Sequence, residues 1–275
     1  DGNGNSTGVL NHDLNEIADA YIDFLSGNEH QKSEYIFTIK KSEVKDHINI
    51  NPQHYSPKLN AALDSVLAFD NKDNWATTTV GQLEAGIRIY IGPRWNSASI
   101  KVDNPTDTSN LVPYLTANAA LELRRFTVKW LDARKANPQQ RQCIDMLKIH
   151  EGDILISRSG TIGKVTYATK DLAENYIVSD DLVRIRVKDA NLRAYLLAYF
   201  TSSTALALML LDEYGSVQQH LQPRHIQEML IPVPDDWSLA QDMIDAGNMF
   251  IKAMEDMSKA DRKIRTQGFD ALIAE

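Results

Sequence analysis

Apolar residues recur at helical spacing in four stretches of the chain. Residues 9–26 and 58–70 have apolar positions three and four residues apart, which predicts amphipathic helices. Residues 192–211 are apolar nearly all round, so we expect a buried helix there. The last 38 residues, 238–275, predict a long terminal helix.

Short β-prone runs, separated by Gly, Pro and Asn, fill most of the chain between residues 77 and 233. The hairpin signal is clearest at 153–167, where two such runs flank a loop that contains Gly160 and Gly163. We also expect a short helix after Gln222, because Pro223 suits the first helical position. The predicted strands are 35–39, 87–91, 126–128, 153–157, 163–167, 182–187 and 230–233. The pattern therefore predicts an α+β fold: a mixed, β-rich domain with a buried helix, followed by a long C-terminal helix.

The terminal helix carries a heptad seam that predicts a helical partner. Its positions alternate four and three residues apart, with Gly247 and Asp261 as interruptions. The seam comprises Met243, Gly247, Phe250, Met254, Met257, Asp261 and Ile264.

Composition is ordinary for a globular protein, but the charge is unevenly placed. The 275 residues are 43% hydrophobic and 24% charged, with a net charge of −8. Residues 124–164 nevertheless hold nine basic and four acidic side chains, a local charge of +5. A local basic face is what contact with phosphate requires, although a solvated face of mixed charge is an equally good interpretation.

Other features limit the class of protein. No apolar run approaches the roughly 18 residues of a membrane span, and no secretion signal is visible. Cys143 is the one cysteine, which excludes an internal disulfide and a cysteine-cluster zinc site. We therefore expect a cytoplasmic protein. Residues 1–8 have almost nothing to bury, so we expect a disordered lead-in to a fragment of something longer.

Four blocks in the second half occur in the order found in a known family. They are residues 152–165 (GDILISRSGTIGKV), 179–186 (SDDLVRIR), 215–221 (GSVQQHL) and 231–234 (IPVP). Together with the long helix that follows, they resemble the target recognition domain and helical spacer of type I restriction-modification specificity subunits. The resemblance covers roughly residues 77–275 and implies recognition of double-stranded DNA.

The front of the chain resembles another subunit of these systems. Residues 13–21 (DLNEIADAY), 42–44 (SEV) and 48–55 (ININPQHY) are similar to the extreme C-terminal tail of the adenine-specific methyltransferase subunit. The resemblance implies a fusion, with a methyltransferase tail and linker at 1–76, a recognition domain at 77–235 and a spacer or dimerisation helix at 236–275. The family's cofactor-binding glycine motif and its catalytic tetrapeptide are absent, since Gln53 and His54 replace the second proline and the aromatic residue. We expect no catalysis from this fragment, while S-adenosylmethionine would serve the parent methyltransferase.

Specificity subunits usually carry two recognition domains and two spacer helices, whereas this chain has one of each. The resemblance thus implies that it reads one half of a bipartite site. A homodimer or a second recognition domain, joined through the C-terminal helix, would supply the other half. The methyltransferase catalytic domain is the other expected partner, and none is expected in a membrane.

The residues that read bases should lie where family members differ, which here means about 88–142. Arg and Lys can pair with guanine, and Asn and Gln with adenine. The candidates are Arg88, Arg94, Asn96, Asn118, Arg124, Arg134, Lys135, Gln139, Gln140 and Arg141. Blocks that recur across different targets cannot encode a target, so for Arg158, Ser159, Thr161 and Lys164 we favour a scaffold or phosphate-positioning role. Gln218 and Gln219 could read adenine or satisfy buried backbone groups.

Two alternatives remain open at this stage. The chain could be an assembly module that binds the methyltransferase, or dimerises, and contacts DNA only weakly. Asp153 and Asp181, with Lys164 nearby, could instead form a metal-dependent nuclease site. A histidine metal site is disfavoured, because His220 and His225 are five residues apart rather than the usual three or four.

Overall fold

The computed structural model describes residues 14–28, 57–83, 86–122, 128–210 and 220–267. Backbone contacts divide the chain into two units, Asp1–Ala61 and Ala62–Glu275. The first unit contains α1 (Leu14–Leu25), which lies within the helix predicted at 9–26. The predicted strand at 35–39 lies outside the described residues. Helix α2 (Pro57–Leu67) begins in the first unit, and a 3-10 turn, η3 (Ala68–Asn71), follows it.

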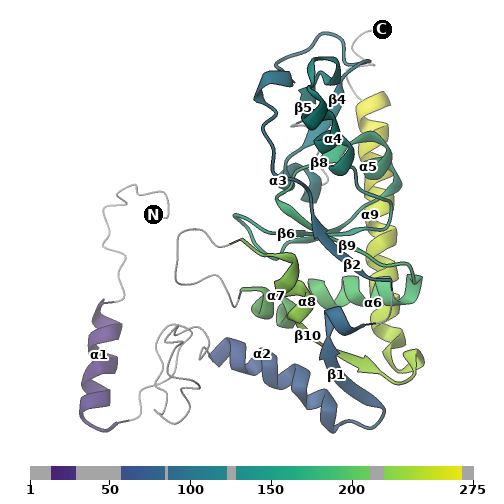
Figure 1. The fold of residues 1–275 in the computed structure, drawn as a ribbon. Helices are drawn as coiled ribbons and strands as arrows, with labels where there is room; N and C mark the ends of the chain where they lie inside the picture. The colour runs from purple at the N-terminus through teal and green to yellow at the C-terminus, as the bar shows by residue number, and fades with distance from the viewer. Residues whose placement is uncertain (1–13, 29–56, 84–85, 123–127, 211–219, 268–275) are drawn as a thin grey trace. The chain divides into compact units, whose positions relative to one another are not determined.

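A four-stranded sheet with the order β2-β9-β6-β7 forms the centre of the second unit (Figure 1). Its strands are β2 (Arg88–Ile91), β6 (Ile154–Ser157), β7 (Val165–Tyr167) and β9 (Leu182–Arg186), all paired antiparallel. The pairing of β6 with β7 confirms the predicted hairpin. All four residues of β6 are buried, which explains its continuous apolar run.

A second four-stranded sheet lies at one end of this unit, in the upper part of Figure 1. Its order is β3-β5-β4-β8, from β3 (Lys101–Val102), β4 (Val112–Leu115), β5 (Val128–Leu131) and β8 (Ile177–Val178). Strand β8 runs parallel to β4, whereas the other pairs are antiparallel. The short helices α3 (Ala117–Leu121), α4 (Pro138–Met146) and α5 (Lys170–Asn175) belong to the same region.

A two-stranded sheet of β1 (Trp75–Thr79) and β10 (Leu230–Pro234) lies at the other end. Helix α6 (Ala190–Thr201) is tied to β10, because the hydroxyls of Tyr195 and Tyr199 donate to the carbonyl oxygens of Pro232 and Leu230. Helix α8 (Pro223–Glu228) begins with proline, as predicted.

The helix predicted at 192–211 is two helices. Helix α6 ends at Thr201, and α7 (Ser203–Met209) begins after Ser202. The Ser202 hydroxyl accepts a hydrogen bond from the Ala205 amide, so this side chain caps a new helix instead of continuing the old one. Burial of α6 is as expected.

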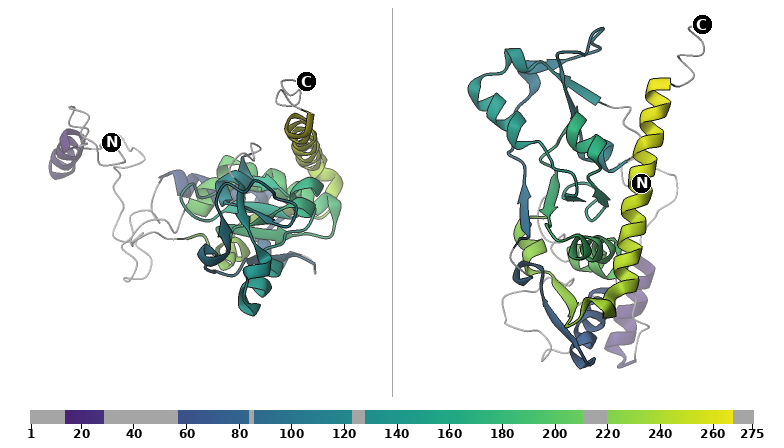
Figure 2. Two further views of the ribbon diagram at one scale, coloured as in Figure 1. Left: turned by 90° about the horizontal axis from the view of Figure 1, so that it is seen from above. Right: turned by 90° about the vertical axis from the view of Figure 1, so that its right-hand side faces the viewer.

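The long terminal helix is α9 (Gln241–Gln267), which begins after a 3-10 turn at Trp237–Ala240. Figure 2 shows it running along one side of the second unit. It packs against α6 at very short range, since a Cβ atom at Gly247 would collide with the backbone of Ala194. In the described part of the chain, no helix is long and apolar enough to cross a membrane.

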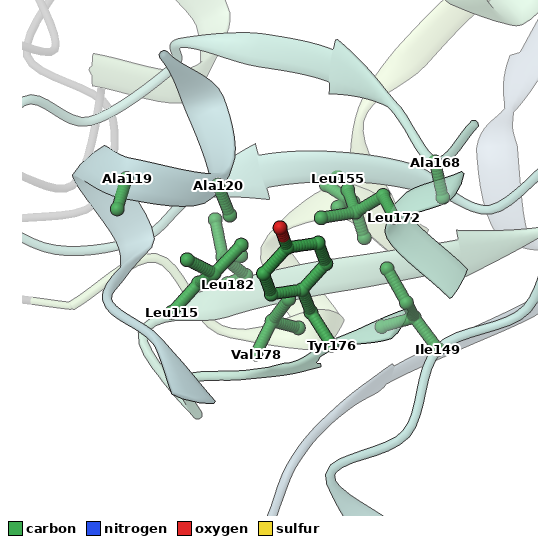
Figure 3. Close-up of a cluster of buried hydrophobic side chains, with 10 residues drawn as sticks. All are labelled: Leu115, Ala119, Ala120, Ile149, Leu155, Ala168, Leu172, Tyr176, Val178 and Leu182. Carbon is green, nitrogen blue, oxygen red and sulfur yellow. The ribbon is translucent and has the colours of Figure 1, made fainter. Parts of the chain in front are cut away.

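The core lies between the two four-stranded sheets. One buried cluster joins them through residues that include Leu115, Leu155 and Leu182, with Tyr176 among them (Figure 3). A second cluster includes residues of the second sheet. It comprises Ile100, Tyr114, Leu131, Ala136, Ile144, Leu147 and Ile177. It fixes α4 and the neighbouring turns onto the second sheet.

Candidate nucleic-acid interface

Helix α4 begins at a well-formed cap. The Asn137 side chain accepts a hydrogen bond from the Gln140 amide at 2.8 Å, and the Gln140 side chain accepts one from the Asn137 amide at 3.1 Å. This is a capping box, and Pro138 occupies the first helical position. The start of α4 is therefore fixed by its own sequence.

The same glutamine ties α4 to a loop more than 40 residues earlier. Gln140 Nε2 donates to the carbonyl oxygen of Asn96 and to Ser99 Oγ, both at 3.0 Å. The Asp132 amide donates to the carbonyl oxygen of Ile100 at 2.8 Å. Two separate parts of the predicted base-reading stretch are thus held together on one end of the domain.

We call the exposed part of this end the polar tip. The residues that form it lie in the loop 94–97, in the turn Ala133–Lys135 or on α4. It comprises Arg94, Asn96, Arg134, Lys135, Gln139, Arg141 and Gln142, all exposed. Arg94 makes no hydrogen bond or ion pair with any other described residue, which leaves its guanidinium available to a ligand.

Arg134 is partly committed within the chain. Its Nε and Nη2 atoms donate to the two carboxylate oxygens of buried Asp132, at 2.8 and 3.0 Å. This pairing lowers the pKa of Asp132 and raises that of Arg134. Lys135 approaches the same carboxylate at 3.9 Å, and Arg141 Nε donates to the Ala136 carbonyl oxygen. Two cations, Arg134 and Lys135, thus share one buried carboxylate, and Arg94 and Arg141 add further positive charge to the tip.

Other predicted DNA contacts lie elsewhere. Arg88 is exposed on β2, with its guanidinium 4.8 Å from the centre of the Tyr90 ring. Asn118 is exposed on α3. Arg124, Gln218 and Gln219 lie outside the described residues.

Three of the four recurring blocks meet at Arg158. Its side chain is only 9% exposed; Nε donates to the Leu221 carbonyl oxygen at 3.2 Å, and Nη1 to that of Asp180 at 3.5 Å. Its backbone amide bonds to Asp181, and its carbonyl oxygen accepts from the Leu221 amide. Arg158 thus holds three segments of the fold together, which favours the scaffold interpretation over phosphate contact.

Ser159 completes this junction. Its hydroxyl donates to Asp181 Oδ1 at 3.1 Å and lies 2.7 Å from His220 Nδ1. Because the hydroxyl proton is used on the carboxylate, the histidine acts as donor through Nδ1. Thr161 and Lys164, on the same loop, are exposed and available to a ligand.

Both arginines of β9 are committed to partners within the fold. Arg184 is fully buried and donates to backbone carbonyl oxygens, including those of Met146 and Val178. Burial lowers the pKa of its guanidinium. Arg186 pairs instead with buried Asp153, through Nε–Oδ1 at 2.8 Å and Nη2–Oδ2 at 3.0 Å. The contacts of Arg184 hold the central sheet against α4 and β8.

The two carboxylates of the nuclease alternative cannot share a metal ion. Asp153 precedes β6 and bonds to Arg186, whereas Asp181 precedes β9 and bonds to Ser159 at the other end of β6. Four residues of strand separate the two sites, about 13 Å. No group of three or more potential metal ligands occurs among the residues the structure describes.

Sequence reasoning missed Gln142 and the helix that carries it. The signal was present, because asparagine followed three residues later by glutamine, with proline between them, is a helix-start pattern. Only the structure shows that the helix points its amides outward at the tip.

Comparison with known proteins places this domain in a family. The family described as "Type I restriction modification DNA specificity domain" matches residues 90–244, and the chain belongs to it. By that description, the family is one of DNA specificity domains. The match includes the polar tip and the junction at Arg158.

Solved structures give more distant matches. The HsdS subunit from Thermoanaerobacter tengcongensis is 16% identical, with a TM-score of 0.43 over 78% of this chain and 48% of its own. The type I S subunit from M. genitalium is 14% identical, with a TM-score of 0.42 over 72% and 45%. The type IIG restriction endonuclease BpuSI is 12% identical, with a TM-score of 0.45 over 86% and 33%. The chain spans half or less of each of these proteins. No curated protein matches it.

Proposed function

We propose that this chain reads one half of a bipartite DNA target for a restriction-modification adenine methyltransferase and performs no catalysis itself. The observation that carries the proposal is the polar tip, where an otherwise acidic protein gathers cations and amides on one rigid end. Cations supply the salt-dependent attraction to phosphate, and amides can discriminate between base edges.

The second half of the target would come from a partner held by α9. The predicted heptad seam was partly wrong, because Gly247 and Met254 face inward in this chain. Of the remaining seam positions, Met243, Met257 and Ile264 are exposed, whereas Phe250 and Asp261 are half-buried. Met243, Phe250, Met257 and Ile264 repeat every seven residues. Ala246, Ala253 and Ala260 lie between them and are also exposed.

This outer seam has the alternating three- and four-residue spacing that a partner helix needs. The side chains of Met257 and Ile264 are 51% and 63% exposed, far more than side chains packed in a core. We propose that a second copy, or a second recognition domain, covers this seam and sets the distance between the two half-sites.

The front of the chain supports the link to a methyltransferase. Residues 13–21, 42–44 and 48–55 resemble its C-terminal tail, and α1 presents exposed Ile17, Tyr21 and Ile22. We propose a parent in which a catalytic domain precedes this tail. S-adenosylmethionine would bind that catalytic domain and no residue described here.

Selection from a random duplex DNA pool tests recognition. The chain is incubated with the pool at low salt, and the retained duplexes are sequenced. We expect a short motif of half-site size, and affinity that falls with salt by a log–log slope of about −0.9 per phosphate contacted. Affinity insensitive to salt would refute the role given to the cations of the tip.

The exposed seam also favours a second function, that of an assembly module with weak DNA contact. Mixing the chain with the methyltransferase catalytic domain separates the two. Stable association with that domain, combined with no retention of DNA from the pool, would establish the assembly function instead.

A further inference from the structure

The outer face of α4 carries amide groups that the chain itself does not use. Gln139 and Gln142 are exposed, and neither bonds to any other residue that the structure describes. Gln140, between them, is fully committed to the cap and to the Asn96 loop. We propose that α4 enters the major groove of the target and that Gln139 and Gln142 each read an adenine. This inference rests on the proposed function and deepens it.

The dimensions of the helix suit the groove. With its side chains an α-helix is about 10–12 Å across, and the major groove is about 12 Å wide. Gln139 and Gln142 are separated by about 4.5 Å along the axis of α4, whereas neighbouring base pairs are about 3.4 Å apart. At 100° per residue, Gln142 lies on the side away from buried Ile144 and Leu147. Its side chain therefore points away from the core, toward any ligand that binds the outer face of α4.

The helix is held rigidly enough to discriminate between bases. Its first turn is closed by the capping box, its inner side is buried in the second core cluster, and Gln140 bridges it to a separate loop. A side chain on such an element loses little freedom on binding, so its hydrogen bonds contribute to specificity.

The surrounding charge favours duplex DNA as the occupant. Arg94, Lys135 and Arg141 lie around the start of α4 and are exposed to solvent. The one carboxylate on the helix, Asp145, is paired with Lys148 at 2.8 Å, which reduces its repulsion of phosphate. Exposed cations beside exposed amides match the phosphates that lie beside the base edges of a groove.

The test compares variants of the full chain in the random-duplex selection. Gln142→Ala should retain DNA with the wild-type salt slope, yet lose the preference for adenine at one position of the motif by about tenfold or more. Gln139→Ala should do the same at a neighbouring position. Gln142→Glu should shift the preference at that position toward cytosine, because a carboxylate can accept a hydrogen bond from the cytosine amino group. Gln227→Ala, at an exposed glutamine of α8, is the matched control and should leave the motif unchanged.

The outcomes separate the inference from the function on which it rests. A wild-type motif that both alanine variants reproduce would overturn the role of α4 and leave DNA recognition intact. A wild-type chain that enriches no motif would overturn both. Loss of adenine preference with unchanged melting temperature, together with the cytosine shift, would support the inference, because a merely structural residue cannot exchange one base preference for another.

Discussion

Replacing Arg158 by alanine distinguishes a scaffold residue from a phosphate contact. The side chain is almost fully buried and donates to the carbonyl oxygens of Leu221 and Asp180. Removing it leaves the buried Leu221 carbonyl and the partly buried Asp180 carbonyl without their donor, and removes a charged group from a hydrogen-bonded site. At about 1–3 kcal/mol for each acceptor, and with the bond to Asp180 at the long limit, we expect the free energy of unfolding to fall by about 2–4 kcal/mol.

Arg94→Ala is the matched control, because Arg94 is exposed and has no partner among the described residues. It should leave stability within about 0.5 kcal/mol of the wild type. Its DNA affinity should nevertheless fall, and its salt slope should decrease by about 0.9 if it contacts one phosphate. The two arginines are thus expected to show opposite effects.

Urea unfolding followed by circular dichroism gives the stability, and fluorescence anisotropy of a labelled duplex at several salt concentrations gives the affinity and slope. Binding is measured without urea, where Arg158→Ala still folds. The scaffold role would be refuted if Arg158→Ala kept the wild-type stability but reduced the salt slope by about 0.9, the value for one phosphate contact.

Three further substitutions test other parts of the fold. Gly247→Val should lower the free energy of unfolding by about 1–3 kcal/mol in urea titrations, because α9 must move away from α6 to fit a side chain. Met257→Glu should abolish self-association on the outer seam in sedimentation experiments, whereas Asn248→Glu, exposed but off the seam, should not. Asp132→Asn should flatten the acid limb of a stability–pH profile: the pKa of Asp132 is lowered by Arg134, so its contribution is present above about pH 4 and is lost as pH falls through the lower native pKa. An unchanged acid limb would show that the pair contributes nothing.

The sequence pattern predicted those elements whose formation depends on interactions between residues close in sequence. The hairpin of β6 and β7, the start of α8 at Pro223 and the long α9 are all present, because apolar spacing and proline position act over a few residues. Four strands were missed: β1 and β4, and also β3 and β8, which have only two residues each. Such strands exist only through pairing with segments that are distant in sequence, so no local pattern can reveal them.

In the candidate site, too, the sequence predicted what depends on residue type but not what depends on the folded environment. Residue types alone selected Arg94, Arg134 and Gln140 together, although their environments differ completely. One is free, one is held by a buried carboxylate, and one is a structural bridge. The contacts of Gln140 reach back more than 40 residues, and the pairing of Arg134 depends on the burial of Asp132 in the folded domain. The sequence therefore identified the region that holds the tip but could not separate its free groups from its committed ones.

The arrangement of the molecule explains why the recurring blocks and the candidate base-reading residues are separate. The recurring blocks converge on Arg158, Ser159 and the buried sheet, where each group satisfies another and a change costs stability. The amides of Gln139 and Gln142 satisfy nothing within the described fold, so they can be replaced without disturbing it. If the tip reads bases as proposed, such a domain would acquire a new target by exchanging side chains at the tip, while the junction that holds its three segments together stays the same. That separation of stability from specificity is what the paired tests on Arg158 and Gln142 measure.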